Sequence, residues 1–164
     1  MSIAENLALA AGKAQTRGLG WALPRKIIQE IKRKIKSLNL GLEERLSENI
    51  GGLSGGERQA LTLLMATWVK PELLLLDEHT AALDPNAAEI ILRLSEELVR
   101  ENRLTTLMVT NSMRQAVTLG SRLLMLHRGK IVHDFKGEAK QRLQVKDLLA
   151  MFDEVKQNED ICLH

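Results

Sequence analysis

The chain has 164 residues, of which 45% are hydrophobic and 2% aromatic, and its formal net charge is +2. This length and apolar content predict a packed globular protein with an aliphatic core, and the longest apolar run is far below the roughly 20 residues that a membrane-spanning helix needs, which excludes direct membrane insertion. The N-terminus lacks the pattern of a secretory signal, and the single cysteine, Cys162, forms no internal disulfide, which fits a reducing compartment.

The N-terminal part of the chain predicts two helices. Residues 2–13 form a short helical pattern, Thr16 to Gly20 read as a turn, and the run from Pro24 to Ser37 is amphipathic. In this run one face is apolar and the other faces carry lysine and arginine; the apolar positions are Ile27, Ile31, Ile35 and Leu38. A solvated basic face is the first interpretation, and a patch that faces nucleic acid or lipid is the alternative. No aromatic residues are interleaved, so we expect no nucleic-acid partner.

The stretch LSGGERQALTLLMATWV, from Leu53 to Val69, predicts a helix with an open N-terminus. Ser54 followed three residues later by Glu57 is a capping box, and Leu61, Leu64, Met65 and Trp68 share one face. Gly55 and Gly56 in the first turn leave backbone N–H groups accessible, and the helix dipole adds positive potential there. These features favour an anion site; the alternative is an ordinary capped helix whose glycines only ease the turn.

The stretch LLLLDEHTAALDP predicts a strand that ends in two carboxylates. Leu73 to Leu76 are continuously apolar, as in the buried centre of a parallel sheet, and Asp77 and Glu78 follow. Asp84 is positioned to cap a helix that begins at Pro85 and runs to about Arg100. The functional interpretation of the acidic pair is a magnesium site beside phosphate; the alternative is a solvated turn.

Further elements follow in alternation: a strand over Thr105–Thr110, a helix over Met113–Leu119, strands over Leu123–His127 and Ile131–Phe135 joined by a turn at Arg128-Gly129, and a helix near Val145–Val155. Strands that alternate with helices indicate an α/β fold with a parallel sheet.

Four motifs in this order closely resemble the ATPase cassette of ABC transporters: LSGGERQ at 53–59, LLLLDE at 73–78, AALDP at 81–85 and VTNS at 109–112. The variant DEHTAALDP is similar to the ATPases of bacterial uptake systems. The resemblance implies the C-terminal part of a P-loop NTPase parallel sheet with a helical subdomain. It divides the chain into a helical part (1–52), an ATPase core part (53–135) and a C-terminal helical tail (136–164).

The resemblance also implies roles for individual residues. The signature motif would contact the γ-phosphate of ATP held by an opposite subunit, with Ser54, Gly55 and Gly56 as the contacting residues. Glu57 and Gln59 of the same motif are further candidate ATP-binding residues, as is Asp84. Asp77 would orient Mg²⁺ through water, and Glu78 would polarise the attacking water. Asp84 would cross the dimer interface, and Asn111 stands where the family has a switch histidine.

Two departures from the family are visible in the sequence. The pattern G-x-x-x-x-G-K-[ST] of a phosphate loop is absent: neither Gly12-Lys13 nor Gly129-Lys130 has the required upstream glycine or a following Ser or Thr. The sequence therefore resembles a cassette without roughly its first third, and the segment Ser2–Leu9 resembles the helix beyond the family's glutamine loop. Asn111 is uncharged and does not titrate, unlike histidine. We expect weak ATP binding and slow or no hydrolysis by the chain alone.

The leading hypothesis is a partial ATP-binding and ATP-hydrolysing subunit, which in its complete form couples hydrolysis to transmembrane transport. Its expected cofactors are ATP and Mg²⁺, its partners a second ABC ATPase subunit in a head-to-tail dimer and a transmembrane permease, and its location the cytoplasmic side of the membrane. The alternatives are a non-hydrolytic, split or decayed cassette that regulates an intact ATPase, and an ATPase of DNA repair or chromosome structure, whose long coiled coil has no counterpart here. His127, His133, His164 and Cys162 lack metal-ligand spacing, and His79 is not assigned as a ligand.

Overall fold

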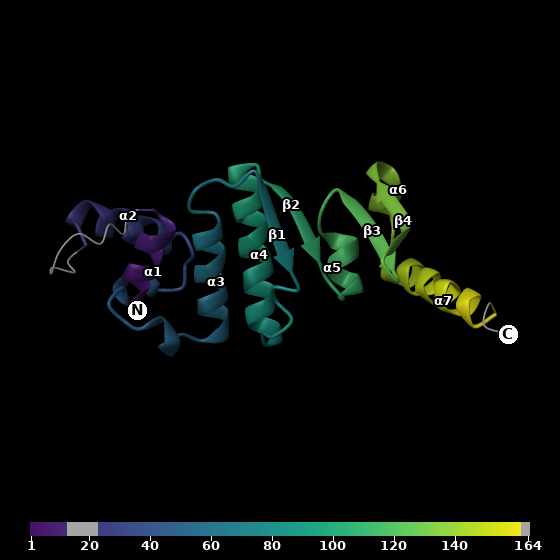
Figure 1. Ribbon diagram of the computed structural model, residues 1–164, viewed down its shortest axis with the longest axis horizontal. Coiled ribbons are helices and arrows are strands. Elements are labelled where there is room, and N and C mark those ends of the chain that lie inside the picture. Colours follow the sequence, from purple (N-terminus) through teal and green to yellow (C-terminus); the bar gives the residue numbers. More distant parts are fainter. Residues whose placement is uncertain (13–22, 162–164) are drawn as a thin grey trace. The chain divides into compact units, whose positions relative to one another are not determined.

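The computed structural model describes residues 1–12 and 23–161, so the turn predicted at Thr16–Gly20 lies outside the described residues. The chain forms two compact units, Met1–Met108 and the residues from Val109 onward (Figure 1). The predicted division into residues 1–52, 53–135 and 136–164 was drawn from the positions of the motifs, whereas the two units are defined by contacts within the fold. The three-part division stays a prediction. In the described part of the chain, no helix is long and apolar enough to cross a membrane.

The first unit begins with two helices and two short 3₁₀ turns: α1 (Ile3–Ala10), α2 (Arg25–Lys36), η1 (Leu42–Glu44) and η2 (Ile50–Gly52). The helix α1 starts at a capping box, because Ser2 Oγ accepts from the Glu5 amide and the Glu5 carboxylate accepts from the Ser2 amide. The predicted apolar face is confirmed: Ile31 and Ile35 of α2 and Leu38 just beyond it are buried, Ile27 is partly buried against the core, and the lysines and arginines are mostly exposed.

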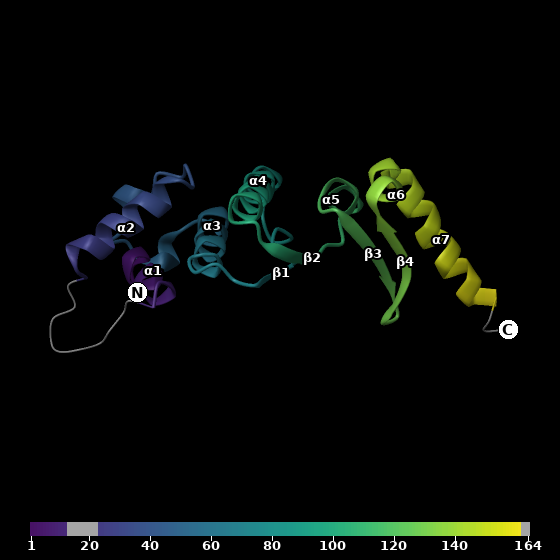
Figure 2. The same ribbon diagram turned by 90° about the horizontal axis from the view of Figure 1, so that it is seen from above.

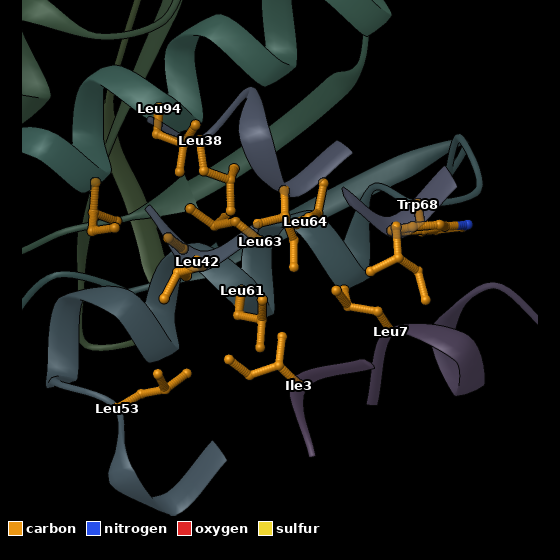
Figure 3. Close-up of a cluster of buried hydrophobic side chains, with 14 of the residues drawn as sticks. Ile3, Leu7, Leu38, Leu42, Leu53, Leu61, Leu63, Leu64, Trp68 and Leu94 are labelled. Carbon is orange, nitrogen blue, oxygen red and sulfur yellow. The ribbon is translucent and has the colours of Figure 1, made fainter. Parts of the chain in front are cut away.

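The rest of this unit consists of α3 (Gly55–Ala66), β1 (Leu73–Asp77), α4 (Pro85–Asn102) and β2 (Thr105–Val109). All four elements are predicted by the sequence to within three residues of their observed ends. One continuous core joins them to α1 and α2 (Figure 3). Leu61, Leu64 and Trp68 of the α3 segment are buried there, and Ile91 and Leu94 contribute from α4. The core therefore holds α3 and α4 side by side, which positions the site described below.

The strands β1 and β2 form a two-stranded parallel sheet, with α4 on one side of it (Figures 1 and 2). The expectation that β1 is buried on both faces is wrong. Its residues alternate, because Leu74 and Leu76 enter the core whereas Leu73 and Leu75 are 50% and 64% exposed. A run of four leucines predicts a strand, but it does not determine whether one or both faces of that strand are buried.

The second unit contains α5 (Met113–Thr118), β3 (Arg122–His127), β4 (Lys130–Lys136), α6 (Gly137–Arg142) and α7 (Val145–Ile161). The strands β3 and β4 pair antiparallel as a separate sheet. Their two-residue turn has positive φ at both Arg128 and Gly129, which matches the twist of a hairpin. A small core of Leu123, Met125, Leu143 and Leu148 holds the unit together. The helix α6 was not predicted.

Candidate functional site

The start of α3 has the geometry that the capping box predicts. Ser54 Oγ accepts a hydrogen bond from the Glu57 amide at 3.2 Å, and Glu57 Oε2 accepts from the Ser54 amide at 2.7 Å. Ser54 and Gly55 are exposed, and Gln59 is partly buried one turn further along. The Gly55 and Gly56 amides precede the first intrahelical bond and have no acceptor in the described part of the chain. This helix end is therefore rigid, accessible and rich in unused donors.

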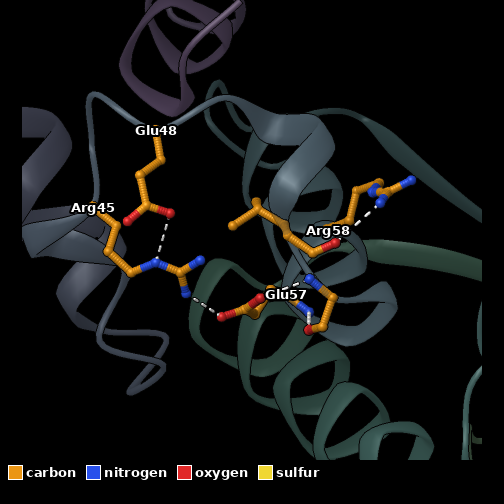
Figure 4. Close-up of polar contacts among 6 residues, drawn as sticks. Arg45, Glu48, Glu57 and Arg58 are labelled. Carbon is orange, nitrogen blue, oxygen red and sulfur yellow. Dashed lines mark hydrogen bonds and ion pairs between the residues drawn. The ribbon is translucent and has the colours of Figure 1, made fainter.

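Arg45 fixes this helix end from outside, and sequence reasoning missed it (Figure 4). Its Nη1 donates to Glu57 Oε1 at 2.5 Å and its Nε donates to Glu48 Oε2 at 2.9 Å. The Ser54 backbone hydrogen bond, assisted by Arg45, holds the pKa of the Glu57 carboxyl below its usual value. Both carboxylate oxygens of Glu57 are therefore engaged within the chain, one by Arg45 and the other by the Ser54 amide. No periodicity relates position 45 to position 57, so only the three-dimensional structure reveals the pair.

The two glycines are explained by close packing against α4. A Cβ on Gly55 would lie 3.2 Å from Leu83 Cδ2, and one on Gly56 would lie 3.1 Å from Ala87 Cβ. Neither glycine has a positive φ, so no turn conformation requires them. Their missing side chains let the start of α3 contact the loop and first turn of α4. This contact brings the signature motif beside the loop that carries Asp84.

Asp84 is the predicted N-cap of α4. Its Oδ1 accepts from the amides of Asn86 at 3.1 Å and Ala87 at 3.0 Å, with Pro85 as the first helical residue. The side chain is exposed, and its Oδ2 makes no hydrogen bond or ion pair within the described ranges. Asp84 thus fixes the turn with one oxygen and leaves the other accessible.

The acidic pair lies where the sequence predicts, at the carboxyl end of β1. Asp77 is the last strand residue, and Glu78 leaves the strand in the left-handed region with φ 41°. Both are exposed, and neither carboxylate forms a hydrogen bond or ion pair with the rest of the described chain, although the Glu78 carbonyl accepts from the Ala81 amide at 2.9 Å. Within residues 1–12 and 23–161 no three His, Cys, Asp or Glu side chains gather as a metal site. Free carboxylate oxygens without a protein cage fit a Mg²⁺ ion that is held mainly by phosphate and water.

His79 connects the acidic turn to α4. Its Nε2 lies 3.0 Å from Ser95 Oγ, and Ser95 Oγ donates its proton to the Ile91 carbonyl at 2.7 Å. Because a hydroxyl has one proton, His79 Nε2 carries the hydrogen and is the donor to Ser95. Burial lowers the pKa of His79, so the ring is held in its neutral form. His79 therefore has a structural role, because its ring holds the turn after β1 against α4. This contact gives no reason to assign His79 as a metal ligand.

Asn111 belongs to the second unit and lies between β2 and α5. It is exposed, and it sits in a turn that its neighbours hold firmly. Thr110 Oγ1 donates to Gln115 Oε1 at 2.7 Å and accepts from the Ser112 amide at 3.1 Å, while Ser112 Oγ caps α5. The predicted position of Asn111 between a strand end and a short helix is confirmed; its role stays a prediction.

Comparison with known proteins points to the same family as the motifs. The family profile described as "ABC transporter" matches residues 1–81. The tyrosine transport ATP-binding protein of Clostridioides difficile is 40% identical over 153 residues, which cover 93% of this chain and 61% of that protein. The energy-coupling factor transporter ATP-binding protein EcfA2 of Clostridium tetani is 33% identical over 124 residues, covering 76% of this chain and 42% of that protein. The chain thus spans about three fifths or less of these relatives.

Solved structures show the same fold. An ABC transporter in an inward-facing conformation matches with a TM-score of 0.69 and 26% identity over 93% of this chain and 59% of that chain. An ATP-binding cassette of an ABC transporter matches with a TM-score of 0.72 and 20% identity over 95% of this chain and 62% of that chain, a likeness that concerns the fold alone. The predicted α/β fold of P-loop NTPase type is confirmed by these neighbours. The chain belongs to the ATP-binding protein family of ABC transporters.

Proposed function

We propose that this chain is part of the ATPase subunit of an ABC transporter and that the start of α3 binds the γ-phosphate of an ATP molecule held by a second ATPase subunit. The observation that carries the proposal is the open N-terminus of α3, where Ser54 and Gly55 are exposed and the Gly55 and Gly56 amides have no acceptor among the described residues. A helix N-terminus with free N–H groups attracts phosphate through both hydrogen bonds and the helix dipole. Glu57 and Gln59 would shape this surface, and Arg45 keeps Glu57 from competing for the phosphate-facing amides.

In the same proposal the acidic pair serves the chemistry of hydrolysis. Mg²⁺ bound with ATP would offset the charge of the phosphates. Asp77 would hold a water of the ion's coordination shell, and Glu78 would accept a proton from the attacking water. Both carboxylates are free of partners in the described chain, which supports these roles. Asn111 would donate an amide N–H toward the γ-phosphate, and Asp84 would reach across the dimer interface with its free oxygen.

ATP binding by the isolated chain is proposed to be weak. The 164 residues contain no phosphate loop, and the acidic pair supplies only negative charge to a polyanion. Calorimetric titration of the purified chain with MgATP should show no saturable heat in the micromolar range. A tight complex would contradict this part of the proposal.

The transport role rests on the named relatives. Several are import proteins by name, including phosphate import ATP-binding protein PstB 1 of Vibrio parahaemolyticus and aliphatic sulfonates import ATP-binding protein SsuB of Burkholderia ambifaria. We infer an uptake system, with a transmembrane permease as partner and residues 1–52 facing it on the cytoplasmic side of the membrane.

A second candidate is a non-hydrolytic cassette that pairs with an intact ATPase and regulates it. Asn111 favours it, because an amide neither titrates nor shares a proton as the family's histidine does. The two candidates predict the same dimer and differ in turnover.

A chimera distinguishes them. The phosphate-loop segment of a complete relative is joined before Met1, and the chimera should form an ATP-dependent dimer in sedimentation experiments. Ser54→Arg should weaken dimerisation at least tenfold by blocking the phosphate surface, whereas Thr62→Arg, an exposed change on the same helix, should not. Equal effects of both variants, or no ATP dependence, would refute the proposed site. Turnover that rises with Asn111→His and vanishes with Glu78→Gln would favour the hydrolytic candidate.

A further inference from the structure

The second unit contains a cavity of about 410 Å³ beside the end of α5, the start of β3 and α6. The residues of interest on its wall are Val117, Gly120, Ser121, Lys140 and Gln141. No acidic side chain lines it. The cavity shares no residue with the surfaces assigned above to ATP or to Mg²⁺.

Lys140 places a positive charge in this wall. The residue is only 5% exposed, and its Nζ donates to the Val117 carbonyl near the end of α5. Capping of that helix end accounts for one of the three N–H groups of the ammonium. Burial lowers the pKa of Lys140, because it disfavours the charged form of the ammonium.

Two acids close to Lys140 in the sequence are paired with arginines. Glu138, on the same helix, binds Arg142 at 3.0 Å, and Asp134 binds Arg122 at 2.7 Å. Within the described residues Lys140 forms no ion pair. A buried charge is stable only with a partner of opposite sign or with full hydrogen bonding. An anion in the cavity would therefore stabilise the charged form of Lys140.

Other groups on the wall can bind an anion together with Lys140. Gly120 has a φ of 68° and turns the chain between α5 and β3. The Gly120 and Ser121 amides donate to no group in the part of the chain that the structure describes. The Ser121 hydroxyl and the Gln141 amide add further donors, because neither has a side-chain hydrogen bond within the described ranges. The wall thus combines a buried cation with several neutral donors.

We propose that this cavity binds a small oxyanion, a phosphate or a carboxylate group, with Lys140 as its charged ligand. The site would give the second unit a ligand-responsive element that is independent of the ATP-facing surface. Its occupancy would satisfy the remaining N–H groups of Lys140 and tie α6 to the loop that precedes β3.

The test is a titration of the ¹⁵N-labelled chain followed by NMR, without nucleotide, so its outcome does not depend on the proposed ATPase role. Inorganic phosphate is one probe and acetate is the other, each at constant ionic strength. The expected result is saturable shifts at the Gly120 and Ser121 amides, and the probe that saturates identifies the phosphate or carboxylate class. Lys140→Met should weaken binding at least tenfold, whereas Lys146→Met, which removes an exposed lysine of α7, should leave it unchanged. Shifts that do not saturate with either anion, or saturation that survives Lys140→Met, would overturn the proposal.

A second pair of variants keeps the test valid if Lys140→Met does not fold. Ser121 is exposed at the cavity wall, so Ser121→Glu supplies a carboxylate from the chain itself. This variant should lose saturable anion binding, and the matched neutral variant Ser121→Gln should keep it within about threefold. Anion binding of equal strength in the two variants would contradict a site centred on Lys140.

Discussion

At the scale of the single residue, Glu78 combines an exposed carboxylate with a backbone that disfavours it. Its φ of 41° lies in the left-handed region, which costs a non-glycine residue roughly 1–2 kcal/mol. Asn tolerates this region better than Glu, and a β-branched residue tolerates it worse. We predict that Glu78→Asn raises the free energy of unfolding by up to about 1 kcal/mol and that Glu78→Val lowers it by at least as much. Urea unfolding checks both; equal stabilities would show that the turn relaxes freely.

His79 predicts a pH dependence of stability. Its folded pKa is lowered by burial, whereas an unfolded histidine titrates near about 6.5. Above that value both states are neutral and the His79–Ser95 contact is fully effective. As the pH falls below about 6.5, the unfolded chain binds the proton first, so the free energy of unfolding decreases until the folded pKa is passed. We predict that His79→Gln flattens the change in urea midpoint between about pH 7.5 and 5.5.

Ser95→Ala is the matched control for His79. It removes the acceptor of the His79 hydrogen bond but keeps the ring covered by α4. The variant should therefore be less stable at both pH values while the sign of the pH dependence is retained. A wild-type chain that becomes more stable on acidification over this interval would contradict the assignment.

At the scale of the element, the start of α3 depends on Glu57 for two separate contacts. The carboxylate completes the capping box with Ser54 and pairs with Arg45. Glu57→Ala removes both contacts and should lower the free energy of unfolding by about 1–2 kcal/mol at neutral pH, whereas Glu57→Gln keeps a capping acceptor and should cost less. Circular dichroism during urea unfolding measures the difference.

The charge of Glu57 adds a second readout. Its folded pKa is depressed, so its contribution to stability is present above the unfolded value of about 4.3 and is lost as the pH falls through the folded pKa. The stability gap between the wild type and Glu57→Gln should therefore shrink on acidification from about pH 6 to below 4. A gap that stays constant over this range would show that Arg45 contributes through packing alone.

The elements themselves could be predicted from local signals. Ser54 and Glu57, and Asp84 with Pro85, define helix starts through contacts within three residues, so the sequence contains all the information that the helix end uses. Arg45 and the His79–Ser95 bond were missed because each joins residues twelve or more positions apart. The helix α6 was missed because it has six residues and one buried side chain, Lys140, which no apolar periodicity marks.

The glycines of the signature motif could be predicted only in part, because their role depends on both local and distant contacts. The sequence predicts an exposed anion site from Gly55 and Gly56, and the helix start is where the prediction places it. The reason that both must lack a side chain is the approach of Leu83 and Ala87, which depends on how α3 and α4 pack. A capped helix alone would accept alanine at either position.

At the scale of the whole molecule, the first unit has an uncovered apolar surface on its sheet. Leu73, Leu75 and Leu107 of β1 and β2 are 50%, 64% and 52% exposed, although their neighbours Leu74 and Leu76 complete the core. A two-stranded sheet also has unpaired N–H and C=O groups on its outer edges, and such edges favour association with other strands. Exposed leucines beside an open edge therefore predict self-association of the purified chain.

Surface substitution tests this prediction directly. Leu75→Lys changes an outward-facing position and should lower self-association, measured as the concentration dependence of the sedimentation coefficient. The free energy of unfolding, measured with urea, should fall by no more than about 0.5 kcal/mol. Leu74→Lys, one residue away and 6% exposed, is the matched control: it places a charge in the core and should unfold the first unit. The two adjacent leucines should respond in opposite ways, because the residues of β1 alternate between exposed and buried positions. The run LLLL contains no feature that distinguishes the exposed leucines from the buried ones. If Leu75→Lys left association unchanged, the contact would have to involve a surface other than this sheet face; if it unfolded the chain as Leu74→Lys does, both faces of β1 would be buried in solution.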